Sequence, residues 1–265
     1  MRIIVTRPLR EALEWAHGLQ QQGWDAQALP LIEIGPAGQL PALHQCWADL
    51  HHYDAVMFVS SNAAQYFYAS KPAPETAARS QIAIKTRAWS PGPGTAKTLL
   101  AAGVTPALLD TPPPDAGQFD SEALWAVVQH QVHPGHRTLV VRGQEGDAHM
   151  VPSTGVGREW LAAQLTAAGG TVDYVVAYSR HAPQFSAAQR ALAQAAAQDG
   201  SVWLFSSSQA LKHLQQWLPD QPWQAARAVA THPRITQAVR AAGFGVVQES
   251  RPALADVMLS IESMA

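Results

Sequence analysis

The stretch DAVMFVSSNAAQYF, residues 54–67, contains the local pattern on which the fold prediction rests. An apolar run leads into a small polar cluster at Ser60 and Ser61, and the residues that follow have helical spacing. The run is too short to be a helix and is typical of a strand buried on both faces. Small polar residues at its end are favoured helix N-caps. The stretch therefore predicts one βα unit.

Segments of this kind recur in the same order along the 265 residues. In each copy a strand, a polar turn and a helix are followed by Gly, which suits the left-handed residue that ends many helices. Such repeated βα units predict an α/β protein with two related domains, each a parallel sheet flanked by helices. Corresponding segments lie about half the chain apart, as a duplicated domain would give. The matching pairs are 2–34 with 137–180, 54–67 with 200–214, and 87–109 with 227–249.

The domain boundaries depend on two extended segments, LPLIEIGPAG at 29–38 and VVAYSRHAP at 175–183. The repeat is compatible with a simple division near residue 135. If the chain instead crosses at both extended segments, one domain is inserted into the other. Residues 110–125 are expected to form a Pro-rich loop that ends in a helix cap, and residues 143–160 a long, mobile, Gly-rich loop.

The composition excludes several classes of protein. Hydrophobic residues make up 47% and charged residues 14%, and the formal net charge of −2 provides no basic field for nucleic acid or an anionic membrane. The single cysteine, Cys46, excludes an intrachain disulfide and a cysteine-based zinc site. The N-terminal apolar run stops at Val5, too early for a signal peptide or a membrane anchor. We therefore expect a cytoplasmic protein.

The serine clusters at 60–61 and 206–208 admit three interpretations. A nucleophilic serine is typically held in a strained G-x-S-x-G elbow, and neither FVSSNA nor LFSSSQ has those glycines. N-capping of the following helix is expected at both clusters. Because a helix N-terminus exposes N–H groups and the positive end of the helix dipole, both places also suit an anion. The sequence favours capped, anion-binding turns over a nucleophile.

The segment SPGPGTAKTL, residues 90–99, extends this prediction to a further turn. Gly92 and Gly94 would let the backbone approach a ligand closely, and Thr95 is expected to cap the following helix. The segment lacks the spacing of a P-loop or a dinucleotide fingerprint. Its counterpart THPRIT has His232 and Arg234 in place of the glycines. A plain tight turn is an equally good explanation of either segment.

Three further side chains could belong to a site. Arg7 and Arg142 follow strands at equivalent places of the repeat, where the carboxyl end of a parallel strand faces a ligand. Each could bind a carboxylate or form a structural salt bridge. Tyr178 lies at the possible crossing between domains, where a phenol could donate a proton or simply pack at a hinge.

The three histidines of HQVHPGH, residues 130–136, are expected on a surface loop rather than in a metal site. Pro134 and Gly135 break any shared helical face, and no Cys or carboxylate completes a familiar metal motif. We therefore expect no metal site in this protein.

Taken together, these segments resemble the uroporphyrinogen-III synthase family. The resemblance covers essentially the whole chain in the family's order. The chain departs from the family pattern at THPRIT, where many members have a second GP-T turn, and in the loop at 143–160. The motifs that carry the resemblance are VTRP, LPLIEI, DAVMFVSSNAA, GPGTAKTLLAAG, LVVRG, GGTVDYVVAYSR, FSSSQAL and RAAGF.

The resemblance implies two flavodoxin-like α/β domains joined by a two-stranded linker, with the active site in the cleft between them. Domain 1 is then 1–34 plus 180–265, domain 2 is 39–174, and the linker strands lie near 30–38 and 175–183. The resemblance also implies a cofactor-independent lyase of the hydro-lyase type. We expect a monomer, with neither nucleic acid nor a membrane as a partner.

The implied reaction belongs to porphyrin biosynthesis and converts hydroxymethylbilane, a linear tetrapyrrole with eight carboxylates, to uroporphyrinogen III. Water is lost and ring D is inverted through a spiro-pyrrolenine. Tyr178 matches the tyrosine proposed in the family to act as a general acid on the departing hydroxyl. The residues expected to bind the substrate are Arg7, Ser60, Ser61, Asn62, Gly92, Gly94, Thr95, Arg142, Gly143, Ser206, Ser207, Ser208 and Arg234.

Two other functional classes stay open on the sequence alone. One is a two-domain protein that binds a small polycarboxylate or anion without catalysis. The other is a regulatory or scaffold protein that keeps this fold without the activity.

Overall fold

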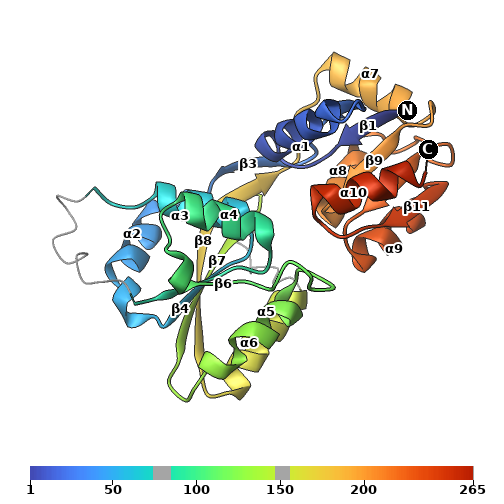
Figure 1. Cartoon of the computed structure of the whole chain (residues 1–265). Coiled ribbons are helices and arrows are strands. Elements are labelled where there is room, and N and C mark those ends of the chain that lie inside the picture. The colour runs from blue at the N-terminus through green and yellow to red at the C-terminus, as the bar shows by residue number, and fades with distance from the viewer. Residues whose placement is uncertain (74–84, 147–155, 265) are drawn as a thin grey trace. The chain divides into compact units, whose positions relative to one another are not determined.

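The computed structural model describes residues 1–73, 85–146 and 156–264. The chain divides into two units: unit 1 is Met1–Glu33 with His181–Ala265, and unit 2 is Ile34–Arg180. Each unit has a sheet with helices on both of its faces (Figure 1). No helix in the described part of the chain is long and apolar enough to span a membrane.

The elements of unit 1 are β1 (Arg2–Val5), α1 (Leu9–Gln21), β2 (Asp25–Ala28), α7 (Ala187–Ala196), β9 (Val202–Phe205), α8 (Ser208–Trp217), β10 (Arg227–Ala230), α9 (Pro233–Ala241), β11 (Val246–Glu249) and α10 (Leu254–Glu262). The strands form a five-stranded sheet in the order β11–β10–β9–β1–β2, and all neighbours pair in parallel. Ile3 and Val5 pack in one buried cluster with residues of α1 and α10. Trp203 donates its indole N–H to the carbonyl of Ala196 in α7, at 3.1 Å.

The elements of unit 2 are β3 (Glu33–Pro36), α2 (Leu40–Ala48), η1 (Leu50–His52), β4 (Ala55–Phe58), α3 (Ser61–Ala69), β5 (Arg87–Trp89), α4 (Pro93–Ala101), η3 (Pro106–Leu108), β6 (Leu109–Asp110), α5 (Ser121–Val128), η4 (Gln129–Gln131), β7 (Arg137–Glu145), α6 (Val156–Ala167) and β8 (Thr171–His181). The six-stranded sheet has the order β3–β8–β7–β4–β5–β6, and the strands from β8 to β6 pair in parallel. Successive residues of β4 face opposite sides, as strand geometry requires. Val56 and Phe58 pack with α2, α3 and α4, whereas Ala55 and Met57 pack with α5 and α6.

The two sheets have the same strand order when each strand is matched with its counterpart in the sequence repeat. The order β11–β10–β9–β1–β2 corresponds to β6–β5–β4–β7–β8, with β3 as an additional edge strand. The predicted fold class, two related α/β units with mainly parallel sheets flanked by helices, is confirmed. The glycines predicted to end helices also have the expected positive φ, namely Gly23, Gly103, Gly169 and Gly243.

The extended segments assigned to the linker are strands of the six-stranded sheet. β8 is continuous from Thr171 to His181 and neighbours β3. The hydroxyl of Ser179 donates to the carbonyl of Pro36 at 3.1 Å and ties the two strands together. The division between the units falls at Glu33 and at Arg180, inside or at the end of these strands.

The loop expected at 143–160 is shorter than predicted. β7 continues to Glu145, because Gly143 to Glu145 pair with β8, and α6 begins at Val156. Residues 147–155 lie outside the described part of the chain. The loop at 110–125 ends in the predicted cap, since Asp120 Oδ1 accepts a hydrogen bond from the Ala123 N–H at 2.9 Å.

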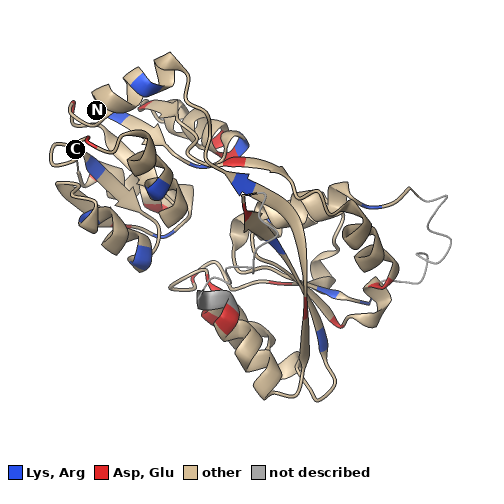
Figure 2. Ribbon diagram, turned by 180° about the vertical axis from the view of Figure 1, so that it is seen from behind, with Lys and Arg blue, Asp and Glu red and all other residues tan. Residues whose placement is uncertain are grey.

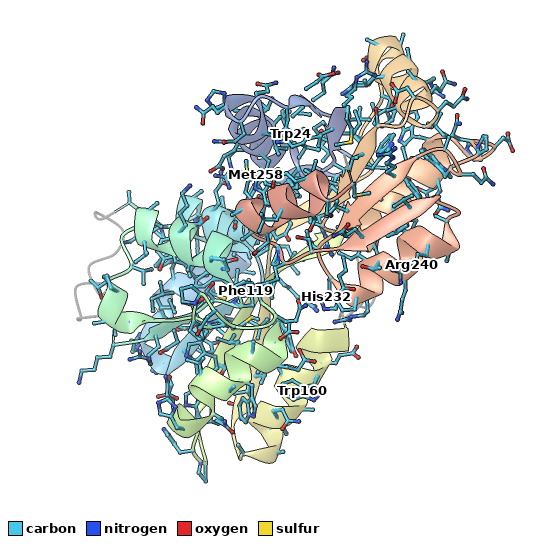
Figure 3. The ribbon with its side chains drawn as sticks, turned by 45° about the vertical axis from the view of Figure 1, so that its right-hand side comes forward. Trp24, Phe119, Trp160, His232, Arg240 and Met258 are labelled. Carbon is cyan, nitrogen blue, oxygen red and sulfur yellow. The ribbon has the colours of Figure 1, made fainter. Side chains whose placement is uncertain are left out.

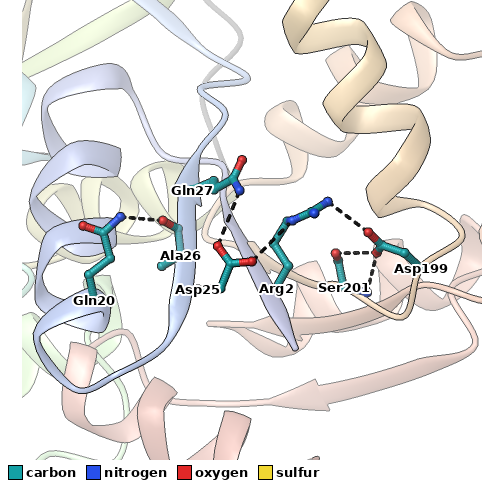
Figure 4. A network of polar contacts seen from close by, with 7 residues as sticks. All are labelled: Arg2, Gln20, Asp25, Ala26, Gln27, Asp199 and Ser201. Atoms are coloured by element: carbon teal, nitrogen blue, oxygen red, sulfur yellow. Dashed lines mark hydrogen bonds and ion pairs between the residues drawn. The ribbon is translucent and has the colours of Figure 1, made fainter.

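Charged residues are sparse and scattered along the ribbon of both units (Figure 2). At the amino edge of the five-stranded sheet they pair with one another (Figure 4). Arg2 Nη1 lies 2.9 Å from Asp199 Oδ2, and Arg2 Nε lies 3.6 Å from Asp25 Oδ2. Asp199 Oδ1 also accepts from the Ser201 N–H at 3.0 Å. This ion-pair network holds β1, β2 and the start of β9 in place.

Candidate functional site

The strongest candidate site lies at the carboxyl edge of the six-stranded sheet. Phe58 of β4 pairs with Val141 of β7, and Val141 pairs with Val175 of β8. Because these strands are parallel, the residues just beyond this level lie at the same edge of the sheet. Open α/β sheets bind ligands at this edge.

Tyr178 and Ser60 are in direct contact at this edge. The phenol oxygen of Tyr178 lies 3.0 Å from Ser60 Oγ, although the two residues are 118 positions apart in the chain. Tyr178 is only 4% exposed, and its ring stacks on Tyr66 of α3 with centroids 6.0 Å apart. Ser60 is the N-cap of α3, because its Oγ accepts the Ala63 N–H at 3.2 Å. The capping hydroxyl therefore also fixes the phenol.

Gly143 provides the space in which the Tyr178 ring lies. The two residues pair across β7 and β8 next to a register shift between Arg142 and Gly143. A Cβ at Gly143 would lie 2.6 Å from Cε2 and 2.7 Å from Cε1 of Tyr178, distances that real Cβ atoms do not adopt. The structure gives Gly143 a packing role beside the phenol, which the sequence had not suggested.

The first turns of α3 and α4 lie next to each other. A Cβ at Gly94 would lie 3.5 Å from Ser61 Oγ, and one at Gly92 would lie 3.1 Å from Cβ of Phe119, which is among the residues labelled in Figure 3. Ser61 and Asn62, both half-buried, occupy the first two positions of α3. The structure therefore brings the Ser60–Asn62 and Gly92–Gly94 turns together, as the two anion-binding turns would require.

The expectation that Thr95 caps α4 is wrong. Gly92 is the N-cap and Pro93 the first helical residue, so Thr95 lies within the first turn, where it is buried. Pro is favoured at this first position because its missing N–H is one that a helix leaves unpaired. The Ser90 hydroxyl donates to the Gly92 carbonyl at 2.7 Å and shapes the turn from the preceding strand.

Arg142 does not join the Tyr178 group. Its guanidinium lies 4.9 Å from the ring centre of Tyr174, and Val140, two residues earlier, packs on the face of α5 and α6. Gly143 and Tyr178 are in contact on the opposite face, in the cluster of α2, α3 and α4. Arg142 is 5% exposed, no carboxylate among the described residues pairs with it, and burial lowers its pKa.

In unit 1 the predicted residues lie at the carboxyl edge of the five-stranded sheet. Ser207 is the N-cap of α8 and accepts the Gln209 N–H at 3.2 Å, with Ser206 before it and Ser208 as the first helical residue. His232 is the N-cap of α9 (Figure 3), because its Nδ1 accepts the Arg234 N–H at 3.1 Å. The Arg234 side chain is exposed. These residues follow β9 and β10, which are neighbours in the sheet.

Arg7 makes structural contacts within unit 1, the alternative to carboxylate binding in the sequence analysis. Its guanidinium lies 3.8 Å from the ring centre of Trp15, and its Nη1 lies 3.8 Å from Glu11 Oε2, one helical turn along α1. Burial is the main influence on its pKa and lowers it, while the nearby Glu11 and Glu14 carboxylates oppose that shift.

Sequence reasoning missed Tyr66, Ser90 and Phe119. Tyr66 lies on the second turn of α3, and its contact with Tyr178 depends on how β4 and β8 are placed in the sheet. Ser90 directly precedes the Gly92 turn, so a polar residue at the end of a predicted strand was a usable indication. Nothing in the sequence around Phe119 indicates its contact with Gly92.

Two comparisons with known proteins agree with this architecture. Crystal structures of a mutant uroporphyrinogen III synthase from the extremely thermophilic bacterium Thermus thermophilus and of uroporphyrinogen-III synthetase from Helicobacter pylori are similar to this chain at TM-scores of 0.56 and 0.58. The sequence identities are 13% and 16%; the first alignment covers 99% of this chain and 98% of the other, and the second covers both chains completely. At these identities the likeness concerns the fold. A protein-family model described as "Uroporphyrinogen-III synthase HemD" matches residues 14–258, and the chain therefore belongs to the uroporphyrinogen-III synthase family.

Proposed function

We propose that this chain cyclises hydroxymethylbilane to uroporphyrinogen III, with loss of water and inversion of ring D. The proposal rests on membership of the synthase family together with one observation, the Tyr178–Ser60 pair at the carboxyl edge of the unit 2 sheet. Binding of a polycarboxylate without catalysis is less well supported, because it leaves the family membership and the placement of the phenol unexplained.

Tyr178 is the proposed general acid for departure of the substrate hydroxyl. Ser60 Oγ accepts the Ala63 N–H and lies 3.0 Å from the phenol oxygen, where either hydroxyl can donate to the other. In the proposed arrangement Ser60 donates to the phenol oxygen. In that arrangement the phenol hydrogen is available to the substrate. As the C–O bond breaks, the proton moves from Tyr178 to the leaving oxygen and water departs. The hydrogen bond from Ser60 then stabilises the phenolate that remains.

The capped helix termini are the proposed carboxylate-binding groups. The first N–H groups of α3, α4, α8 and α9 have no partner within their helices, and each N-terminus carries about half a positive charge. In unit 2, the N-terminus of α3 contacts Tyr178 through Ser60, and the first turn of α4 lies next to the first turn of α3. Holding several carboxylates at once would bend a flexible tetrapyrrole toward the spiro route, so that positioning supplies much of the catalysis.

Cofactor independence, a cytoplasmic location and a monomeric state belong to the same proposal. They are supported by the family resemblance, the single cysteine and the sequence composition.

The decisive experiment measures the isomer formed by wild type, Tyr178→Phe and Tyr68→Phe. Enzymatically generated hydroxymethylbilane is supplied, and types I and III uroporphyrinogen are resolved over time. Loss of a general acid should slow type III formation by about 10² to 10⁴-fold in Tyr178→Phe. Tyr68 is the matched control, a half-buried tyrosine of α3 whose ring packs near Trp47 and Phe58.

Two outcomes would refute parts of the proposal. If wild type yields only type I at the spontaneous rate, the chain is not a synthase. If Tyr178→Phe forms type III as fast as wild type, Tyr178 is not the general acid, although the activity stands. Tyr178→Phe should unfold with a free energy within about 1 kcal/mol of wild type, because it loses a single hydrogen bond.

A further inference from the structure

A second group of polar side chains, Asp54, His133 and His136, lies at the opposite edge of the unit 2 sheet. Asp54 directly precedes β4, and His136 directly precedes β7. One candidate ligand atom from each residue lies within 4.8 Å of the other two. We propose that these three residues bind a divalent transition-metal ion of the Zn²⁺ type.

The Pro-Gly turn brings the two histidines together. The His136 N–H donates to the His133 carbonyl at 3.0 Å, and Gly135 has a φ of 89°. This is a turn with Pro134 at its second position and a left-handed glycine at its third, the arrangement that Pro followed by Gly favours. The two imidazole rings consequently lie edge to face, with centroids 5.5 Å apart. As the sequence indicates, Pro134 and Gly135 prevent the histidines from sharing one face of a helix. The tight turn brings His133 and His136 together without a helix.

His136 is not the surface residue that the sequence predicted. It is 3% exposed and stacks on the buried indole of Trp89, with centroids 5.6 Å apart. Within the described part of the chain neither of its ring nitrogens makes a hydrogen bond of good geometry, although the Gln131 backbone interacts with the ring. A buried imidazole nitrogen without a partner is costly, and coordination of a metal would satisfy one of the two nitrogens. Its Nδ1 lies 3.9 Å from Asp54 Oδ2, which places the lone pair on the side of the other two ligands.

The surrounding backbone orients the other two ligands. His133 Nδ1 lies 3.1 Å from the Pro134 carbonyl, which can only accept, so Nδ1 carries the hydrogen and Nε2 presents a lone pair. The Arg137 N–H donates to Asp54 Oδ2 at 2.8 Å and holds the carboxylate. Such outer hydrogen bonds to the ligands are a regular feature of metal sites.

The repeated unit offers an internal comparison. At the amino edge of unit 1 the carboxylates of Asp25 and Asp199 are both paired with Arg2 (Figure 4). In unit 2 the guanidinium of the corresponding Arg137 pairs with Asp173, at 3.0 Å, and only the backbone N–H of Arg137 bonds the Asp54 carboxylate. Asp54 instead faces the two histidines, so the same edge of the fold carries a cation in one unit and a set of metal ligands in the other.

Two imidazole nitrogens and one carboxylate oxygen are a ligand set that Zn²⁺ accepts, with water in the fourth position. In tetrahedral coordination with bonds of about 2.1 Å, ligand atoms lie about 3.4 Å apart. The Asp54 and His133 side chains are exposed, so rotation about their side-chain bonds can bring their ligand atoms closer together than the observed spacing.

The proposed metal site is separate from the candidate active site. Asp54 and Ser60 are six positions apart, on either side of β4, a span of about 20 Å at about 3.3 Å per residue. A metal at Asp54 would tie the η4–β7 turn to the start of β4 and so stabilise unit 2 without touching the substrate. The proposal does not depend on the proposed function.

The test uses the full chain without an affinity tag, first freed of metal with EDTA. Zn²⁺ is titrated by calorimetry, and Co²⁺ by its visible absorption, which reports tetrahedral coordination. Wild type should bind one equivalent with a Kd below about 10 µM, and its melting temperature should rise with Zn²⁺ concentration. His133→Gln and Asp54→Asn, both at exposed positions, should weaken binding by about 100-fold or more, because losing a ligand costs at least as much as losing an outer-shell partner.

The matched control is His130→Gln, an exposed histidine of η4 outside the cluster. It should bind both metals as wild type does. The proposal is overturned if wild type shows no tetrahedral Co²⁺ spectrum and no thermal shift, or if His133→Gln and His130→Gln bind Zn²⁺ equally well. Either result can be reached with folded protein, since both substituted side chains are exposed.

Discussion

Gly143→Ala is the sharpest test of how the phenol of Tyr178 is held. The added Cβ would lie 2.6 and 2.7 Å from two ring carbons of Tyr178, and the backbone of both residues is fixed by the pairing of β7 with β8. Gly143 has no positive φ, so the substitution adds steric overlap and no backbone strain. Overpacking of this kind costs about 1–3 kcal/mol.

The ring can relieve the overlap only by moving away from β7. Tyr66 stacks on the ring and Ser60 binds the hydroxyl at 3.0 Å, so any displacement disturbs both contacts. We therefore expect Gly143→Ala to destabilise unit 2 by about 1–3 kcal/mol and also to slow type III formation. The second effect distinguishes displacement of the phenol from a general loss of stability.

Urea unfolding gives the stability, and isomer analysis under conditions where the variant is fully folded gives the rate. The matched control is Gly35→Ala, a glycine of β3 whose added Cβ would have an ordinary contact of 3.5 Å with Ser179 Oγ. If Gly143→Ala is as stable and as active as Gly35→Ala, the ring does not lie against Gly143 in the way that the structure shows.

Three further predictions concern caps, pH and a close backbone contact. Ser60→Ala removes a helix cap and the hydrogen bond to the Tyr178 phenol, whereas Ser207→Ala removes only a helix cap. In urea unfolding, Ser60→Ala should therefore lower the free energy of unfolding by about 1 kcal/mol more than Ser207→Ala does. Equal losses of stability would argue against the hydrogen bond to the phenol. Burial lowers the pKa of His136, so below about pH 6.5 the unfolded chain binds a proton more readily than the folded chain. In EDTA, the stability that His136 contributes should therefore be complete above about pH 6.5 and be lost as the pH falls below that value. His136→Gln should flatten this pH dependence of the free energy of unfolding, and an unchanged slope would contradict the prediction. Gly245→Ala would place its Cβ against the backbone carbonyl of Gln224, so its free energy of unfolding, measured by thermal unfolding, should fall by about 3 kcal/mol or more. A Cβ at Gly117 would have no atom within 4 Å, so Gly117→Ala should melt as wild type does.

The local features of this chain were predictable from the sequence. Buried apolar runs, small polar caps and helix-ending glycines depend on neighbours within a few residues, and Ser60, Ser207 and Asp120 are the caps that such patterns indicate. The duplication likewise specified two related sheets. The prediction that Thr95 caps α4 was wrong because the helix begins at Pro93, about one turn earlier than a cap at Thr95 would require.

Contacts across the sheets required the tertiary structure. Tyr178 meets Ser60 because β8, β7 and β4 are neighbours in one register, and Arg142 points to the other face because strand side chains alternate. The approach of His133 and His136 to Asp54 depends on a tight turn placed beside β4. Sequence determined which elements form, because propensity and patterning act locally. Only the tertiary structure decided which side chains meet, because strand order and register join residues more than a hundred positions apart.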